Sequence, residues 1–134
     1  MHIWGLAMKL LYTEMLQRFP EIKSEISENK ELPYLLMNCL VDWLKELGDA
    51  ITPAIIGRVV TFAHWCEDQP RSQDAGDDLF TIYICGFFED LFKSASTRRI
   101  LPHLVTRDDL IHNADYLRQW VGVENYERAL QEYD

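Results

Sequence analysis

The sequence predicts an all-α fold: a single domain of stacked antiparallel helical hairpins, either armadillo- or HEAT-like or an irregular helical bundle. Three observations carry this prediction. The 134 residues are 48% hydrophobic and 26% charged, which is the balance of one compact globular domain. Apolar residues recur three and four positions apart through most of the chain, as on one face of a helix. Proline, glycine and capping residues stand where these patterns start and stop, and no Gly- or Ser-rich linker divides them.

The predicted domain spans residues 8–134, and residues 1–7 are expected to form a loosely ordered N-terminal extension, because helical periodicity starts near Met8. The apolar start has no basic n-region, and Lys9 interrupts it before a signal-peptide core is complete. The three cysteines are widely spaced, which does not suggest a disulfide framework. No apolar run reaches the roughly 18 to 20 residues of a membrane-spanning helix. These features favour a soluble, cytoplasmic protein.

The first half of the chain carries the patterns of four helices. A proline stands in the first turn of three of them, where its missing N–H costs nothing. Gly48 is expected to end the third helix and Thr52 to cap the fourth, so the two form a hairpin. The predicted helices cover residues 8–19, 20–28, 33–47 and 53–67. Their predicted inward positions are Leu11, Met15, Phe19, Ile22, Ile26, Leu36, Leu40, Val41, Leu44, Leu47, Ile55, Ile56, Val59, Val60, Phe62, Ala63 and Cys66.

A loop over residues 67–78 separates this half from the next helix. It has no apolar periodicity and carries five acids against one base. Asp77 or Asp78 is expected to cap the helix that begins at Leu79. That helix is predicted to be the central core helix, and polar or small residues at every fourth position favour a helix over a strand. Its predicted core residues are Phe80, Ile84, Phe87, Phe88 and Leu91.

The last third of the chain predicts shorter helices. A helix over residues 98–104 is disturbed by Pro102. Thr106 and Asp109 resemble a capping box with Asp in place of Glu, which opens another helix that stops near Gly122. Its predicted inner row is Leu110, Ala114, Leu117 and Val121, and a final amphipathic stretch presents Val123, Tyr126, Leu130 and Tyr133.

No motif in the sequence specifies a reaction, so the chain is not expected to be an enzyme, and no catalytic residue, metal or cofactor is predicted. His64 and Cys66 lie two positions apart on a helix and therefore point apart, which disfavours a zinc site. Burial of the cysteines in apolar segments is expected to raise their thiol pKa values and make them inert. The loop over residues 67–78 has Pro70 where an EF-hand needs an early ligand. The paired acids elsewhere are explained by helix capping and solubility.

The charge balance points instead to protein binding. Thirteen Lys and Arg against 22 Asp and Glu give a net charge of -9, which opposes direct binding to nucleic acid. Negative charge is concentrated in the loop after residue 66, where it can steer a basic partner. Trp65 adjoins this loop and can supply desolvated contact area. The predicted partner-binding residues are Trp65, Glu67, Asp68, Asp74, Asp77 and Asp78.

Four short motifs carry a resemblance to a known group. Phe19-Pro20-Glu21-Ile22, Pro33-Tyr34, Phe87-Phe88-Glu89-Asp90-Leu91 and Leu101-Pro102 resemble small bacterial helical proteins that accompany polymorphic toxins, over most of residues 8–120. The resemblance implies a cytoplasmic immunity protein that binds a cognate effector toxin and blocks its active site. It transfers no individual binding residue. A toxin with a basic, anion-binding active site would suit the acidic surface.

Two other classes stay open on the sequence. One is a regulatory or scaffold protein whose concave surface binds a peptide or a helix through apolar contacts. The other is a small-ligand pocket or enzyme built around His64, Cys85 or the tyrosines. An acidic mimic of DNA that inhibits a nuclease is a variant of the binding hypothesis. The sequence does not specify the oligomeric state.

Overall fold

The computed structural model describes residues 4–134, with side chains from Ala7 onward, and the described residues form helices and turns without a strand. The predicted all-α class is confirmed. The helices are α1 (Trp4–Arg18), α2 (Lys23–Glu28), α3 (Pro33–Leu47), α4 (Pro53–Glu67), α5 (Leu79–Tyr83), α6 (Ala95–Arg98), α7 (Leu101–Leu104), α8 (Arg107–His112), α9 (Ala114–Val121) and α10 (Val123–Gln131). Short 3-10 turns are η1 (Pro20–Ile22), η2 (Gly48–Ala50), η3 (Ala75–Asp77) and η5 (Glu89–Lys93), and η4 (Ile84–Phe88) is a π-helix.

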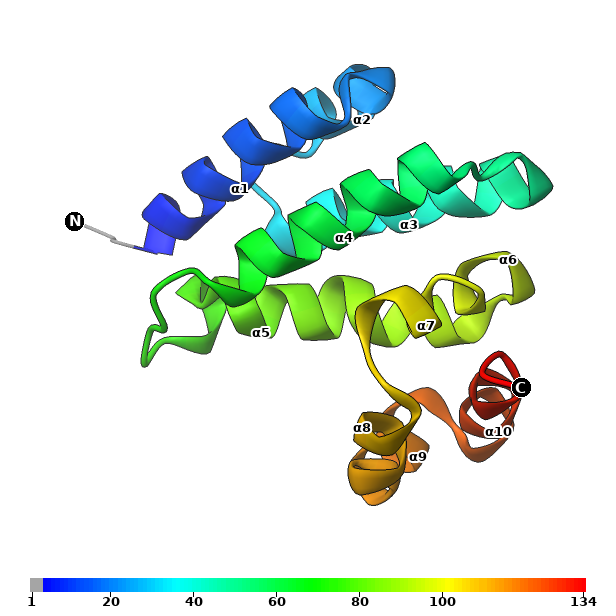
Figure 1. The fold of residues 1–134 in the computed structure, drawn as a ribbon. Coiled ribbons are helices and arrows are strands. Elements are labelled where there is room, and N and C mark those ends of the chain that lie inside the picture. The colour runs from blue at the N-terminus through cyan, green and yellow to red at the C-terminus, as the bar shows by residue number, and fades with distance from the viewer. Residues whose placement is uncertain (1–3) are drawn as a thin grey trace.

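The helices stack in the order in which they occur along the chain. In Figure 1, α1 and α2 lie on one side, α3 and α4 follow, and the continuous helical segment from α5 to η5 comes next. Helix α4 runs antiparallel to α3 and to the segment from α5, as short connections require. Helices α8–α10 lie against the far side of that segment, beyond a single connection after α7. The segment from Leu79 to Lys93 is therefore central to the fold.

The N-terminal end of α1 is attached to the loop that follows α4. Helix α1 begins at Trp4, four residues before the predicted start of the domain, and residues 1–3 of the predicted extension lie outside the described residues. The backbone N–H of Ala7 donates to Oδ1 of Asp77 at 3.2 Å. The first backbone N–H groups of a helix have no partner within the helix, so this carboxylate satisfies one of them. Residues 4–7 of the predicted extension thus belong to helix α1.

The predicted boundaries of α3 and α4 are confirmed, and a cap marks the point between them on each side. Gly48 ends α3 with a positive φ of 52°, a conformation that other L-residues rarely adopt. The Thr52 hydroxyl accepts a hydrogen bond from the N–H of Ile55 at 3.2 Å and caps α4. Most predicted inward residues are buried, while the predicted inward positions Leu47, Ile55, Ile56 and Val60 are only half-buried.

A chain of aromatic contacts forms the centre of the core. Phe19, just after α1, meets Trp43 of α3 with ring centroids 6.1 Å apart and Phe62 of α4 at 5.5 Å. Phe62 also meets Phe87 of η4, 6.4 Å away and perpendicular to it. Edge-to-face pairs of this kind add roughly 0.5–1.5 kcal/mol each beyond the burial of their area. The contacts of Phe19 and Phe62 therefore tie helices α1, α3 and α4 to the central segment.

The central segment differs from the uniform helix that the sequence predicts. It passes from α-helix through one π-helical stretch to a 3-10 turn, and its buried row includes Leu79, Ile82 and Tyr83. The predicted core residues Phe80 and Ile84 are only half-buried. The physical reason is that the segment has neighbours on two sides, so it carries two apolar rows instead of one.

Tyrosine hydroxyls connect the C-terminal helices to the chain that precedes them. The predicted capping box is confirmed: Thr106 accepts from the N–H of Asp109 and Asp109 accepts from the N–H of Thr106. The buried Tyr126 donates from its hydroxyl to the carbonyl of Leu110 at 3.0 Å, and Tyr133 donates to the carbonyl of Val105 at 3.0 Å. The prediction that Val123 faces inward is wrong, because its side chain is 60% exposed at the turn between α9 and α10.

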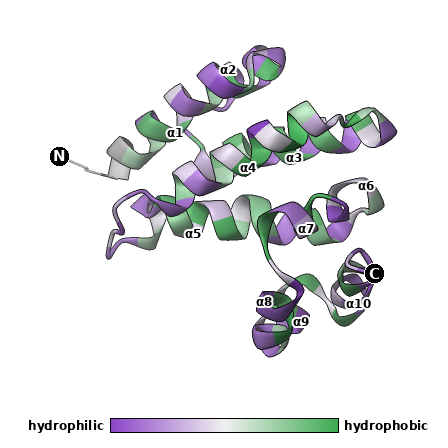
Figure 2. Cartoon of the chain, in the orientation of Figure 1, coloured by the Kyte–Doolittle hydropathy of each residue, from purple (hydrophilic) through white to green (hydrophobic). Residues whose placement is uncertain are grey.

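Hydropathy follows this arrangement. Figure 2 shows hydrophilic residues on the loop between α4 and α5 and hydrophobic residues along the central segment. Within the described part of the chain, no helix is both long enough and apolar enough to cross a membrane.

The packing at Gly86 gives a testable prediction. A Cβ at this position would lie 3.0 Å from Cβ of Met37 and 3.2 Å from Cδ1 of Tyr34, so Gly86→Ala is expected to lower the free energy of unfolding by about 1–3 kcal/mol. The matched control is Gly57→Ala in α4, where a Cβ meets nothing within 4 Å. Because alanine favours a helix over glycine, the control is expected to raise the free energy of unfolding by up to about 1 kcal/mol. Urea denaturation measures both variants, and equal stability of Gly86→Ala and the wild type would contradict the close approach.

Candidate functional site

The predicted partner-binding residues divide into exposed and internal groups. Glu67, Asp68 and Asp74 are exposed, Trp65 and Asp77 are half-buried, and Asp78 is buried. Trp65 stacks on the buried Phe62 with ring centroids 6.2 Å apart and an interplanar angle of 15°. One face of the Trp65 ring thus belongs to the core.

Asp78 is a structural residue, which corrects its predicted place on the binding surface. Its carboxylate pairs with Arg71 at 3.0 Å and accepts hydrogen bonds from the N–H of Ser72 at 3.0 Å and the hydroxyl of Thr81 at 2.6 Å. Burial opposes its ionisation, but these hydrogen bonds and the Arg71 charge outweigh burial and lower the pKa of Asp78 to about 2. Asp78 stands at the N-cap of α5, yet its side chain makes no capping bond to the helix. Its charge is used within the chain to shape the loop.

Two further acids of the loop also make internal bonds. The carboxylate of Asp74 accepts from the N–H of Gly76 at 3.0 Å, and Asp77 accepts from Ala7. Asp74 remains exposed despite this bond. We define the acidic surface as Glu67, Asp68 and Asp74, the three predicted carboxylates that the fold leaves exposed.

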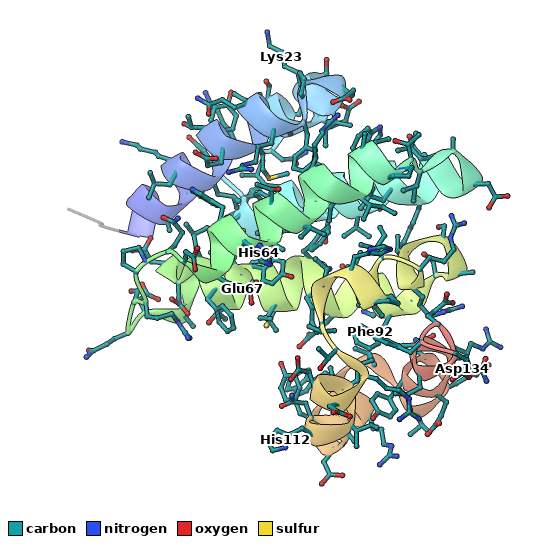
Figure 3. The ribbon with its side chains drawn as sticks, viewed as in Figure 1. Lys23, His64, Glu67, Phe92, His112 and Asp134 are labelled. Atoms are coloured by element: carbon teal, nitrogen blue, oxygen red, sulfur yellow. The ribbon has the colours of Figure 1, made fainter. Side chains whose placement is uncertain are left out.

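A groove adjoins the acidic surface at Glu67. It has a volume of about 430 Å³ and lies between the central segment and the helices from α7 to α9. Figure 3 places Glu67, like His64, at the end of α4 beside α5. Burial raises the pKa of the Glu67 carboxyl, an effect that the nearby His64 opposes. The sequence left open a small-ligand pocket around His64, Cys85 or the tyrosines, and of these residues Tyr83 and Tyr116 line the groove.

Tyr116 of α9 stands at the groove and is bonded to a buried acid. Its hydroxyl donates to Oε2 of Glu89, a side chain that is only 7% exposed. Burial raises the pKa of Tyr116, and the hydrogen bond and charge of Glu89 raise it further. Trp120, one turn along α9, lies 6.2 Å from Tyr116 and is 59% exposed. Trp120 is therefore more accessible than Trp65, which the sequence favoured as the aromatic contact.

The cysteines differ in their exposure. Cys66 is buried, which raises its pKa, while Cys39 is half-buried and also has a raised pKa, chiefly through burial. Cys85 is exposed, contrary to the expectation of burial. The neighbours that cover part of its side chain and the charge of Glu89 still raise the pKa of its thiol. Among the described residues, no three His, Cys, Asp or Glu side chains come close enough together to hold a metal ion.

No family model, curated protein or solved structure matches the chain.

The low pKa of Asp78 gives a second prediction. The variant Asp78→Asn is expected to lose about 1–2 kcal/mol of stability near neutral pH, since Arg71 is exposed to solvent on its outer side and the pair is partly screened. A carboxyl with a lowered pKa stabilises the fold above its unfolded pKa, about 3.9, and loses that contribution as the pH falls through its folded pKa. The difference in stability between wild type and variant should therefore shrink from about pH 5 to about pH 2.

Chemical denaturation across this pH range measures the difference. The control is Asp74→Asn in the same loop, because an amide oxygen can still accept the bond from Gly76. This control is expected to change the stability near neutral pH by no more than about 0.5 kcal/mol. A difference between wild type and Asp78→Asn that stays constant over the whole range would contradict the role of the Arg71 pair.

Proposed function

We propose that this chain is an immunity protein that binds a cognate effector toxin in the cytoplasm and blocks its active site. The observation that carries the proposal is the acidic surface: Glu67 and Asp68 at the end of α4 and Asp74 in the loop after it are exposed and have no basic partner among the ion pairs of the described residues. The resemblance of the sequence motifs to proteins that accompany polymorphic toxins supports the same function.

The ion pairs of the described residues engage about half of the basic side chains. Seven of the 13 Lys and Arg side chains pair with acids of the same chain. The paired bases are Arg18, Arg58, Arg71, Lys93, Arg99, Arg118 and Arg128. Surface pairs of this kind contribute little to stability, and each neutralises one base together with one acid, so the excess of acids in the chain remains.

A negative surface suits a partner whose active site binds an anion. Toxins that act on nucleic acids or nucleotides need a basic active site, and an acidic protein seated there excludes the substrate while satisfying the same cations. Charge complementarity of this kind raises the association rate and its dependence on salt more than it raises the final affinity. In this proposal the chain binds and blocks but carries out no reaction of its own.

Co-purification tests the proposal. The tagged chain is purified from the organism that encodes it, at low and at moderate salt, and stoichiometric partners are identified by mass spectrometry. The partner is then expressed alone and together with the chain. We expect the partner alone to arrest growth and the chain to restore it. A partner whose expression does not affect growth, or no stoichiometric partner at either salt concentration, would overturn the proposal.

Neutralising the acidic surface gives a third prediction. The triple variant Glu67→Gln, Asp68→Asn, Asp74→Asn is expected to lower the association rate with the toxin by about tenfold at low salt and to flatten its salt dependence. Surface plasmon resonance over a series of salt concentrations measures both. The matched control is Glu25→Gln, Glu28→Gln, Glu46→Gln, which removes the same charge from exposed positions of α2 and α3. Equal loss in the two triple variants would show that net charge acts, and not this surface.

A further inference from the structure

The groove beside the acidic surface has two apolar walls. Phe80, Ile84 and Phe88 form one wall, from three successive turns of the central segment. Leu104, Leu110 and Leu117 form the other, from α7, α8 and α9. These six side chains come from the central segment and from three of the helices that follow it. The groove is therefore a product of how the C-terminal helices pack against the central segment.

The wall on the central segment is accessible at Phe80 and Ile84, while Phe88 is buried. Phe80 and Ile84 are half-buried, although they lie on the segment that forms the centre of the core. Large apolar side chains that remain partly exposed in a concave site gain when a partner covers them, at about 25 cal/mol for each Å² of apolar surface removed from water. A volume of about 430 Å³ is within the range of sites that bind ligand groups.

The rim of the groove is acidic. Glu67, the last residue of α4, and Asp109, in the first turn of α8, both line the groove. Tyr116, also at the groove, connects to the buried Glu89 through its hydroxyl. The groove-lining residues include no Lys or Arg in the described structure. Arg71, whose guanidinium lies 4.5 Å from the Phe80 ring centroid, is already paired with Asp78.

We propose that this groove is the docking site for a short segment of the toxin in which one or two large apolar side chains stand beside Lys or Arg. The inference rests on the proposed function and names the chemistry of the bound segment. The apolar side chains enter between the two walls, and the cations pair with Glu67 and Asp109 at the rim. Because Glu67 belongs both to the groove and to the acidic surface, steering and docking use one continuous area.

A phage-displayed library of random dodecapeptides tests the groove without any toxin. The library is selected on the immobilised full chain and on the variant Ile84→Arg, which places a long cationic side chain between the walls. The matched control is Ile111→Arg on α8, a side chain that is 46% exposed and does not line the groove. Circular dichroism establishes that each variant is folded.

The expected result is enrichment of peptides that combine Leu, Phe or Trp with Lys or Arg. Their retention should fall by about tenfold on Ile84→Arg and stay unchanged on Ile111→Arg. If Ile84→Arg does not fold, Glu67→Lys at the rim replaces it, with Glu46→Lys on α3 as its control, and the same loss is expected for basic peptides.

Three results would overturn the inference: no enriched peptide, enriched peptides that are neutral or acidic, or retention that the groove variants leave unchanged. If the peptide selection gives one of these results, the co-purification result still stands, because the selection uses no toxin. Conversely, a peptide that fits the groove would remain a finding even if the co-purified partner proved harmless to growth.

Discussion

The close approach of helix α3 to the central segment at Gly86 is the contact on which the rest of the structure depends. A Cβ at Gly86 would lie 3.0 Å from Cβ of Met37, so a larger side chain there would require α3 or the central segment to shift by a few tenths of an ångström. The same turn is π-helical, and Phe87 within it reaches Phe62 of α4. One turn of chain thus brings α3 and α4 onto the central segment, and the aromatic contacts of Phe19 add α1.

Neighbours on two sides explain why the central segment departs from a regular α-helix. Its buried row packs into the helices before it, while Ile84 and Phe88 turn to the groove and to the C-terminal helices. Inserting a π-helical turn changes the direction of the side chains that follow it, and such turns occur often at functional sites. Glu89 follows the turn directly and lies buried beside Tyr116. The π-helical turn and the groove therefore have the same cause, which is that the central segment packs against helices on two sides.

Local signals in the sequence determined the helix ends well, because capping is short-range chemistry. Thr52 and the capping box of Thr106 act within three residues, and Gly48 adopts its positive φ at the end of its helix. Phe80 and Ile84 on the central segment were mistaken for core, since periodicity shows which residues are apolar but not how completely neighbours cover them. Asp78 was misplaced for a related reason: its partner Arg71 is near in sequence, but only the folded loop closes the pair.

The acids at the end of α4 and in the loop after it form two groups, one internal and one exposed. Asp77 and Asp78 hold the loop to α1 and to Arg71, so their charges lie in fixed hydrogen bonds. That fixed loop carries Asp74, and Glu67 and Asp68 precede it at the end of α4. An exposed carboxylate steers a partner best when its position does not fluctuate, because the complementary charge then meets it without a further loss of conformational entropy. In the proposed function, the internal acids hold in place the loop that carries Asp74, so we expect neutralising Asp78 to weaken binding through that loop.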